Sequence, residues 1–564
     1  MTIALYYHPE AYTTSGPKLM GRHAAGESFL RGFLRHHACD AFWLQVARSE
    51  HAQAFAAAAQ AHGRKETVHV LGAEHLAALA KVGAVYHPGP GIGQHAWQRA
   101  NFGHAQWSLC GITHTTSSAA AMDALVDLLT APVQPWDALI CTSTAVKDQV
   151  SKVLQAQVDH LAERLGITRV VLPQMPVIPL GIHTDDFLFS LSARSQARQQ
   201  LGLAPDALAV LFMGRLSFHA KAHPLAMYQA LELASRRSAK DVVLIECGWH
   251  ANAFIAKAFE DAARLACPSL RVVQLDGRKA ADRQTAWAAA DLCTSLSDNI
   301  QETFGLVPLE AMAAGLPLVV SDWNGYKDTV RDGVDGFRVP TLMPAEGLGA
   351  DLALRHALEV DSYDMYCGHA CSFVAVDVEA AAQAYTQLLS SPALRSRMGK
   401  AGQERAQAQY DWKQVIAQYE GLWAQLAALR AQHAREKTQG PSPDIRVARR
   451  RSWPARMDPF AGFSAYPSRT LDPGTRLRLV DTDPEVALAR ALSYRKLAMI
   501  DFAKALLPSD QDIRTVLLAA ARGPASAAEL VAAFDRSHQA SVLRGLAWMV
   551  KLHLLRPDAK AAHP

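Results

Sequence analysis

Two successive series of short apolar segments constrain the fold of this chain more than any other feature. The first series occupies residues 1 to about 180, and the second begins near Leu208. In both, apolar runs of single-strand length alternate with alanine-rich stretches of helical period. This alternation predicts parallel sheets with helices on both faces. We therefore expect an α/β protein with two facing Rossmann-like, doubly wound domains.

The apolar runs end at small or polar residues, as strands do when ligand loops follow them. The expected strands cover residues 3–7, 42–46, 67–71, 84–86 and 138–142 in the first series, and 210–214, 242–246, 272–276, 292–295 and 318–321 in the second. With 564 residues, half of them apolar, the chain is long enough for three or four domains with cores of their own.

The segment DNIQETFGLVPLE (298–310) carries two glutamates around a Phe-Gly turn. A glycine followed by apolar residues predicts a helix that begins near Gly305. The free N–H groups at the start of a helix favour a phosphate. Glu302 precedes this helix and Glu310 lies two turns into it, so the two carboxylates can reach different polar groups of one ligand. The alternative is an amphipathic helix with two solvated glutamates.

A basic loop, GRLSFHAK (214–221), follows the first strand of the second series. Two cations at a strand end stabilise a leaving diphosphate more in the transition state than in the ground state. Arg215 and Lys221 are the two cations. The alternative is that both are solvated surface charges.

These segments, with the strand and turns at 318–325 and 332–337, resemble the retaining GT-B glycosyltransferases of family 4 (glycosyl transferases group 1). The resemblance implies catalytic roles for Arg215, Lys221 and Glu302, with Glu302 beside the donor sugar. It implies that Glu310 binds the ribose of the donor. The donor-binding residues between the two glutamates would be Thr303, Phe304, Gly305, Leu306 and Val307.

Weaker matches add further candidates. His114 follows an apolar strand and resembles the family's histidine near the donor sugar, whereas a lone histidine in an apolar run is usually a core group. Gly26 and Arg22 take the place of the glycine-containing loop after the first strand, although the family's adjacent glycine pair is absent. Gly277 and Arg278 end a strand where the family places the nucleotide base.

The resemblance implies a domain order along the chain. We expect an acceptor-side domain at 1–180, a nucleotide-sugar donor domain at 181–405, a helix returning to the first domain at 406–430, a basic proline-containing linker at 431–475, and a helical, winged-helix-like module at 476–564. In that module Ser526 and Glu529 form a capping box. Its third helix, over 541–556, is mainly apolar, so we expect contact with a protein partner or a packing role rather than binding of nucleic acid.

Charge and cysteine usage bear on possible anionic partners, disulfides and metal sites. The formal net charge of +4 neither demands nor excludes an anionic partner. The eight scattered cysteines fit reduced core thiols, and Cys367 with Cys371 lacks a second ligand pair for a metal. We expect no metal and no cofactor. Without a leader or a membrane-length apolar run, a cytoplasmic protein is expected.

The helix expected at 24–37 carries phenylalanines beside arginines and could touch an anionic membrane peripherally, but a core-facing helix is favoured. We therefore expect a retaining hexosyltransferase that moves a sugar from a nucleotide-diphosphate sugar to a hydroxyl of a saccharide, lipid-linked or small-molecule acceptor. The alternatives are a nucleotide-sugar epimerase or phosphorylase, and a non-catalytic nucleotide-sugar-binding regulator that acts through the terminal module.

Overall fold

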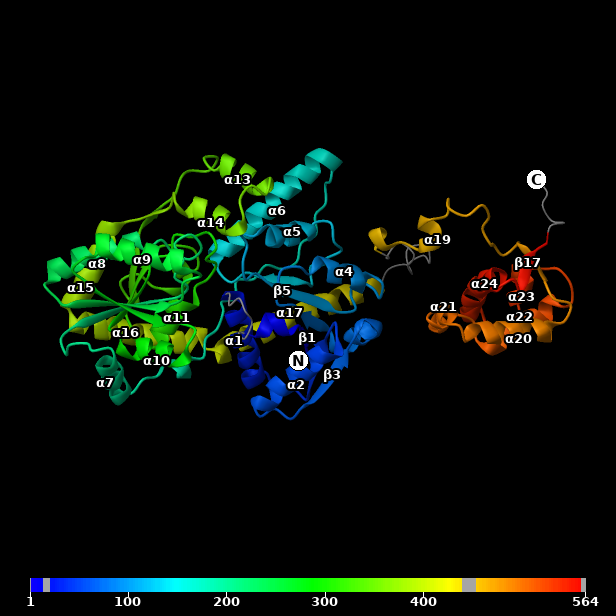
Figure 1. Ribbon diagram of the computed structural model, residues 1–564, viewed down its shortest axis with the longest axis horizontal. Helices are drawn as coiled ribbons and strands as arrows, with labels where there is room; N and C mark the ends of the chain where they lie inside the picture. Colours follow the sequence, from blue (N-terminus) through cyan, green and yellow to red (C-terminus); the bar gives the residue numbers. More distant parts are fainter. Residues whose placement is uncertain (1, 14–20, 439–452, 559–564) are drawn as a thin grey trace. The chain divides into compact units, whose positions relative to one another are not determined.

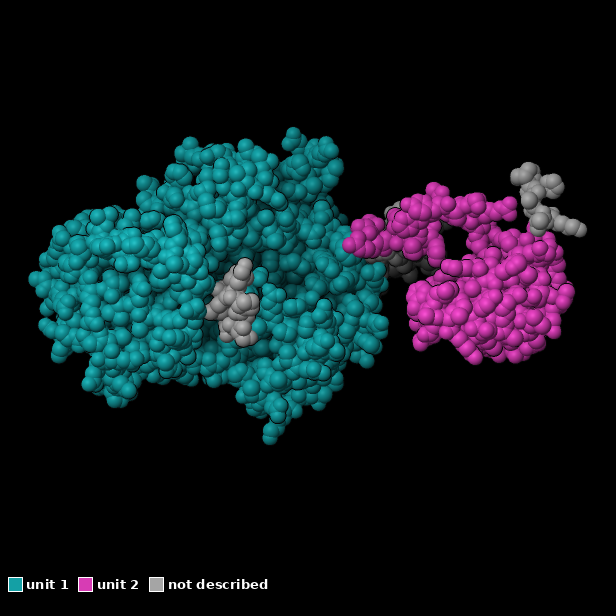
Figure 2. All heavy atoms as spheres, in the orientation of Figure 1, with its two compact units in different colours: residues 1–453 teal, residues 454–564 magenta. Residues whose placement is uncertain are grey.

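The computed structural model describes residues 2–13, 21–438 and 453–558, and the chain forms two compact units, residues 1–453 and 454–564 (Figure 2). The first unit contains two six-stranded sheets whose strands all run parallel. The predicted pair of Rossmann-like domains is confirmed.

Both sheets have the doubly wound strand order, β3-β2-β1-β4-β5-β6 in the first and β9-β8-β7-β10-β11-β12 in the second (Figure 1). The first sheet consists of β1 (Ala4–Tyr6), β2 (Ala41–Gln45), β3 (Thr67–Leu71), β4 (Ala84–Tyr86), β5 (Ser108–Ile112) and β6 (Ala138–Ile140). The second consists of β7 (Leu208–Met213), β8 (Val242–Gly248), β9 (Arg271–Asp276), β10 (Leu292–Ser295), β11 (Leu318–Ser321) and β12 (Gly336–Val339). Strands β7, β8, β10 and β11 are buried along their whole length, as strands covered by helices on both faces must be.

Helices alternate with these strands and cover both sheets (Figure 1). Those of the first domain are α1 (Gly21–His36), α2 (Ser49–Ala61), α3 (Leu79–Val82), α4 (Gly93–Ala100), α5 (Ala119–Asp127) and α6 (Thr144–Leu165). Those of the second are α7 (Leu191–Gln200), α8 (Leu225–Ser238), α9 (Ala253–Ala266), α10 (Ala280–Ala289), α11 (Leu306–Ala313), α12 (Tyr326–Thr329), α13 (Ala350–Ala357), α14 (Tyr363–Cys371), α15 (Val378–Ser390) and α16 (Pro392–Arg405). A short antiparallel pair, β13 (Thr341–Leu342) with β14 (Ala375–Val376), flanks α13 and α14.

The chain returns to the first domain through α17 (Trp412–Thr438), which packs against α1. Trp412 is fully buried and its indole N–H donates to Ser28 Oγ at 2.7 Å. A Cβ added to Gly32 of α1 would lie 2.5 Å from the Trp412 ring. The same holds for Gly181, which lies in the outgoing crossing, the segment around residues 177–181 that leads from the first domain to the second. Two glycines thus let the indole lie between α1 and the crossing.

Helix α1 faces the core, as favoured from the sequence. Phe29, Leu30, Phe33 and Leu34 are all buried against the first sheet and α17. Among the helices of the described residues, none combines the length and the apolar character that a membrane span requires.

The second unit contains α19 (Pro459–Gly462), α20 (Pro484–Arg495), α21 (Ala498–Asp501), α22 (Asp510–Ala520), α23 (Ala527–Val531) and α24 (Arg536–Lys551), with an antiparallel sheet of β15 (Arg476–Leu479), β16 (Ala525–Ser526) and β17 (Leu555–Pro557). The predicted capping box of Ser526 and Glu529 is confirmed. The expectation that the last helix continues to Arg556 is wrong, because β17 pairs with β15 there and buries Leu555. The most basic part of the predicted linker lies outside the described residues.

Candidate active site

Three glycines bring the ends of neighbouring strands together in the second domain. Gly214 follows β7 with φ +145°, a conformation that side chains rarely adopt. A Cβ on Gly248 would lie 2.0 Å from the Gly214 carbonyl oxygen, and one on Gly277 would lie 2.9 Å from Gly248 Cα. The Gly277 N–H donates to the Gly248 carbonyl at 2.8 Å. Packing between backbones therefore accounts for a glycine at these strand ends, Gly277 included.

The basic loop and the first glutamate meet directly. Lys221 Nζ pairs with Glu302 Oε2, and the two side chains are 23% and 11% exposed. Burial alone would raise the pKa of Glu302, but the Lys221 cation and the N–H groups of Phe304 and Thr303 outweigh it and lower that pKa. Glu302 is thus held as a carboxylate in a largely enclosed position.

Four polar side chains of the segment 298–302 hold the basic loop against the glutamate segment. Asn299 Nδ2 donates to the His219 carbonyl at 3.0 Å, and Asp298 Oδ1 accepts the His223 N–H at 3.1 Å. Gln301 Oε1 accepts from the Arg215 guanidinium at 3.0 Å, and Glu302 completes the set with Lys221. Sequence reasoning missed the roles of Asp298, Asn299 and Gln301. Their occurrence within the same short polar run as Glu302 is the signal that the sequence carries for them, and it does not identify their partners.

Helix α11 begins where the sequence predicts. Gly305 is its N-cap with φ +85°, and an added Cβ would lie 2.1 Å from the Tyr326 ring. Leu306 and Val307 form the first turn, so their N–H groups are free of intrahelical partners. Tyr326 is fixed from the other side by Ser295, whose hydroxyl lies 2.7 Å from the phenol. The segment thus presents an open helix end beside Glu302.

Glu310 is the fifth residue of α11, so it lies one turn into the helix and not two as expected. Burial raises its pKa to about 7, against the opposing charges of Arg283 and Lys221. In the described part of the chain its carboxylate has no hydrogen-bond partner. A half-buried carboxylate without a partner, one turn from an open helix end, is suited to accept hydroxyl groups of a ligand.

The first domain contributes the loop after β5. Thr303 Oγ1 donates to the His114 carbonyl at 3.1 Å, and Ser143 Oγ donates to the Thr303 carbonyl at 2.9 Å. Burial, with the nearby charge of Arg22, lowers the pKa of His114 to about 4, so the imidazole is neutral near pH 7. The structure therefore brings His114 against the segment that contains Glu302, whereas the half-exposed Arg22 pairs with Glu10 at 3.6 Å.

Gly26 lies within a helix, and Arg278 follows the end of β9 as expected. Gly26 takes the place of the family's glycine-containing loop but lies inside α1, as the helix expected at 24–37 implies, and a Cβ there would come within 1.9 Å of the Ala11 carbonyl oxygen. Its backbone N–H is used within the helix. Arg278 is 64% exposed and its Nε donates to Asp276 Oδ1 at 2.9 Å.

The cysteines are free thiols, and all but the partly exposed Cys39 are buried. Cys367 and Cys371 lie on α14, where Cys371 Sγ contacts the Gly368 carbonyl. Within residues 2–13, 21–438 and 453–558 no group of three or more potential metal ligands occurs.

Two doubly wound domains, whose strand-end loops meet at His114 and Thr303, form a GT-B architecture. Residues 207–352 match the family model described as Glycosyl transferases group 1, so the chain contains a domain of this group.

Curated relatives of this chain include several named D-inositol 3-phosphate glycosyltransferase. The protein from Thermobispora bispora is 26% identical over 274 residues, 47% of this chain and 62% of that relative. The protein from Nocardia farcinica is 34% identical over 205 residues, 35% of this chain and 44% of that relative. The chain thus spans about half the length of the curated relatives it matches.

Solved structures similar to the chain include the Anabaena protein HepE in complex with UDP, at 16% identity and a TM-score of 0.49, covering 75% of this chain and 100% of that one. A sucrose-phosphate synthase from Thermosynechococcus elongatus is 18% identical with a TM-score of 0.45, covering 76% of this chain and 99% of that one.

Proposed function

We propose that this protein transfers a sugar from a nucleotide-diphosphate sugar to an acceptor hydroxyl. The observation that carries the proposal is the Lys221–Glu302 pair beside the open end of α11, with Arg215 held on the same loop by Gln301. Cations and free N–H groups at one place favour a diphosphate. An adjoining carboxylate suits a sugar hydroxyl.

Breaking the bond between the sugar and the phosphate leaves extra negative charge on the nucleotide. Arg215, Lys221 and the amides of Leu306 and Val307 would stabilise that charge, and because they are held before reaction they act more on the transition state than on the ground state. Glu302, by this assignment, orients the donor sugar, and Glu310 accepts hydroxyl groups of the ribose.

We also propose the finer assignments that the family resemblance implies. These are retention of anomeric configuration, a neutral His114 as a hydrogen-bond partner of the donor sugar, and contributions from Arg22 and Arg278 to donor binding. They include the expected division of the first unit into an acceptor-side domain at 1–180 and a donor domain at 181–405. The anomer of the product, read by NMR at early times, tests retention.

A donor panel tests the proposed activity. The full chain is incubated with UDP-, GDP- and ADP-sugars, and diphosphate release is followed together with thermal stabilisation. We expect release from one donor and loss of that release in Glu302→Ala with donor binding retained. Stabilisation by a donor that no tested acceptor or water converts to free diphosphate would favour the non-catalytic regulator instead.

A further inference from the structure

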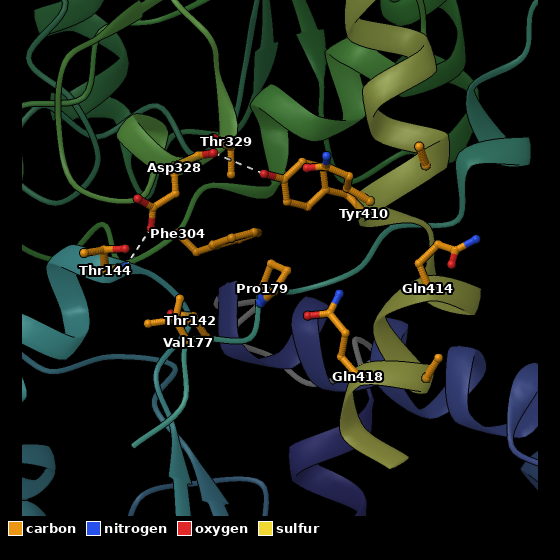
Figure 3. A pocket seen from close by; sticks show the side chains of 13 residues that line it. Thr142, Thr144, Val177, Pro179, Phe304, Asp328, Thr329, Tyr410, Gln414 and Gln418 are labelled. Carbon is orange, nitrogen blue, oxygen red and sulfur yellow. Dashed lines mark hydrogen bonds between the residues drawn. The ribbon is translucent and has the colours of Figure 1, made fainter. Parts of the chain in front are cut away.

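A cavity of about 670 Å³ lies beside the two crossings that join the Rossmann-like domains (Figure 3). Its walls come from the end of β6, the start of α6, the outgoing crossing at 177–179, α12, and the returning segment at 408–418. Of the predicted catalytic and donor-binding residues, Phe304 alone appears in the described lining. This hinge cavity is therefore separate from the groups that would bind the donor diphosphate.

The lining of the hinge cavity is nearly uncharged and combines apolar surface with polar side chains. Gln409, Gln414 and Gln418 line it from the returning segment, and the Gln418 side chain extends from α17 toward Pro179 (Figure 3). Asp328 is the lining carboxylate, and it accepts the Thr144 N–H at 2.6 Å. Among the described lining residues there is no lysine or arginine, so the cavity offers no cation to a phosphate or carboxylate ligand.

Thr142 supplies a second, independent observation. It lines the cavity, is 1% exposed, and its hydroxyl has no hydrogen-bond partner in the described part of the chain. Buried hydroxyls are nearly always paired, because an unmet partner is costly. A hydroxyl of a bound molecule would supply that partner.

We propose that the hinge cavity binds a neutral polyhydroxylated molecule of monosaccharide to disaccharide size. Val177 and Pro179 offer exposed apolar surface for the C–H groups of a sugar ring, while the glutamine amides both donate to and accept from hydroxyl groups. The volume lies within the range of about 300–1,000 Å³ that small-molecule sites occupy.

Occupation of this cavity is linked to the spacing of the two domains. Both crossings form its walls, and the bond between Thr144 and Asp328 joins the domains at its edge. Phe304 contacts the cavity with its ring while its N–H supports Glu302. A bound molecule that favours one domain spacing must change donor affinity, and the donor must change its affinity by the same factor. This linkage rests on the proposed function, whereas binding at the cavity does not.

The test uses the full chain with trehalose and glucose as neutral probes and glucose 6-phosphate as a charged probe. Calorimetry measures binding, and hydrogen–deuterium exchange locates it. We expect a neutral probe to bind at millimolar concentration and to protect residues 177–179 and 408–418. The double variant Gln414→Ala, Gln418→Ala should bind it at least tenfold more weakly, and Ala417→Trp should abolish binding by filling the space. Gln407→Ala is the control, because Gln407 is exposed on the same segment but does not line the cavity.

Three results would overturn the proposal. They are no binding of either neutral probe, unchanged binding in the double variant and in Ala417→Trp, and displacement of the probe by a nucleoside diphosphate with protection confined to the donor loops. Equal or tighter binding of glucose 6-phosphate would contradict the neutral character assigned to the ligand. Because these readouts need no turnover, failure of the proposed transfer reaction would leave them intact, and a changed donor affinity in the presence of the probe tests the linkage separately.

Discussion

Replacing Lys221 by alanine separates the contribution of its ion pair to stability from its contribution to chemistry. Both partners are mostly buried, so the variant leaves the Glu302 carboxylate enclosed without its cation. Two unit charges about 4 Å apart interact by about 4 kcal/mol at an effective dielectric constant of about 20. Residual hydration and the recovered solvation of the lysine offset roughly half of this, which leaves a loss of about 2 kcal/mol.

For a domain of about 150–250 residues, such as the expected donor domain at 181–405, a loss of about 2 kcal/mol lowers Tm by roughly 4–8 °C. The pKa of Glu302 is lowered in the folded protein, so the stabilisation is present above the ordinary carboxyl pKa and is lost as pH falls through the folded value. The Tm difference between wild type and Lys221→Ala should therefore be full at pH 7 and should shrink in acid. Diphosphate release should fall about a hundredfold or more.

The double variant Lys221→Ala, Glu302→Gln tests whether the unpaired charge of Glu302 causes the lower Tm. Removing the stranded charge should restore most of the lost Tm while activity stays lost, because the cation for the leaving group is still missing. Lys240→Ala, at an exposed lysine of the same domain, should change neither quantity. A double variant as unstable as the single one, or a single variant with wild-type Tm at pH 7, would refute the electrostatic account.

Three further outcomes are expected. Asn299→Ala removes the hydrogen bond to the His219 carbonyl and should lower kcat about tenfold or more with little change in KM. The reason is that the variant makes the basic loop less rigid but removes no contact to a ligand. Steady-state kinetics, with a circular dichroism spectrum that should stay unchanged, checks this. Glu310→Gln should be more stable than wild type at pH 8, by up to about 3 kcal/mol in urea melts, and this difference should vanish near pH 4. The reason is that the pKa of Glu310 is raised to about 7 in the folded state. The free energy of unfolding of the wild type therefore declines as pH rises from the ordinary carboxyl pKa through that value. Turnover should be unchanged in excess chelator, since helix end and cations neutralise the diphosphate; loss of activity that Mg²⁺ restores would contradict this.

The fold could be predicted from the sequence because most strands are short apolar segments with clear ends. Segments such as β7 and β8 are mainly apolar, with Glu246 of β8 as the exception, and buried throughout, and each stops at or just before a glycine. The strand β12 was missed because Arg338 interrupts its short apolar run, and only its parallel pairing with β11 defines it. Tertiary pairing decides such segments, and a single sequence does not contain it.

The candidate site could be predicted in part. Whether a residue could be found depends on whether its partner is a side chain or the backbone. Arg215, Lys221 and Glu302 could be found because charged groups at fixed spacing after strands form a pattern. The roles of Asn299 and Asp298 could not, because their partners are the backbone carbonyl of His219 and the N–H of His223, which any residue would provide. Contacts from a side chain to the backbone leave no mark on the partner's identity.

Two glycines show why position in a motif is weaker information than local geometry. Gly305 has φ +85° and lies against the Tyr326 ring, so both its conformation and its neighbour exclude a side chain where α11 opens. Gly26 has a helical backbone, and only the close Ala11 carbonyl requires a glycine there. The first glycine shapes the open N-terminal end of α11, while the second lets a turn pack on a helix. Because Gly26 lies within α1, it offers no open loop in the first domain, and under the proposed function donor contacts there would come from side chains such as His114.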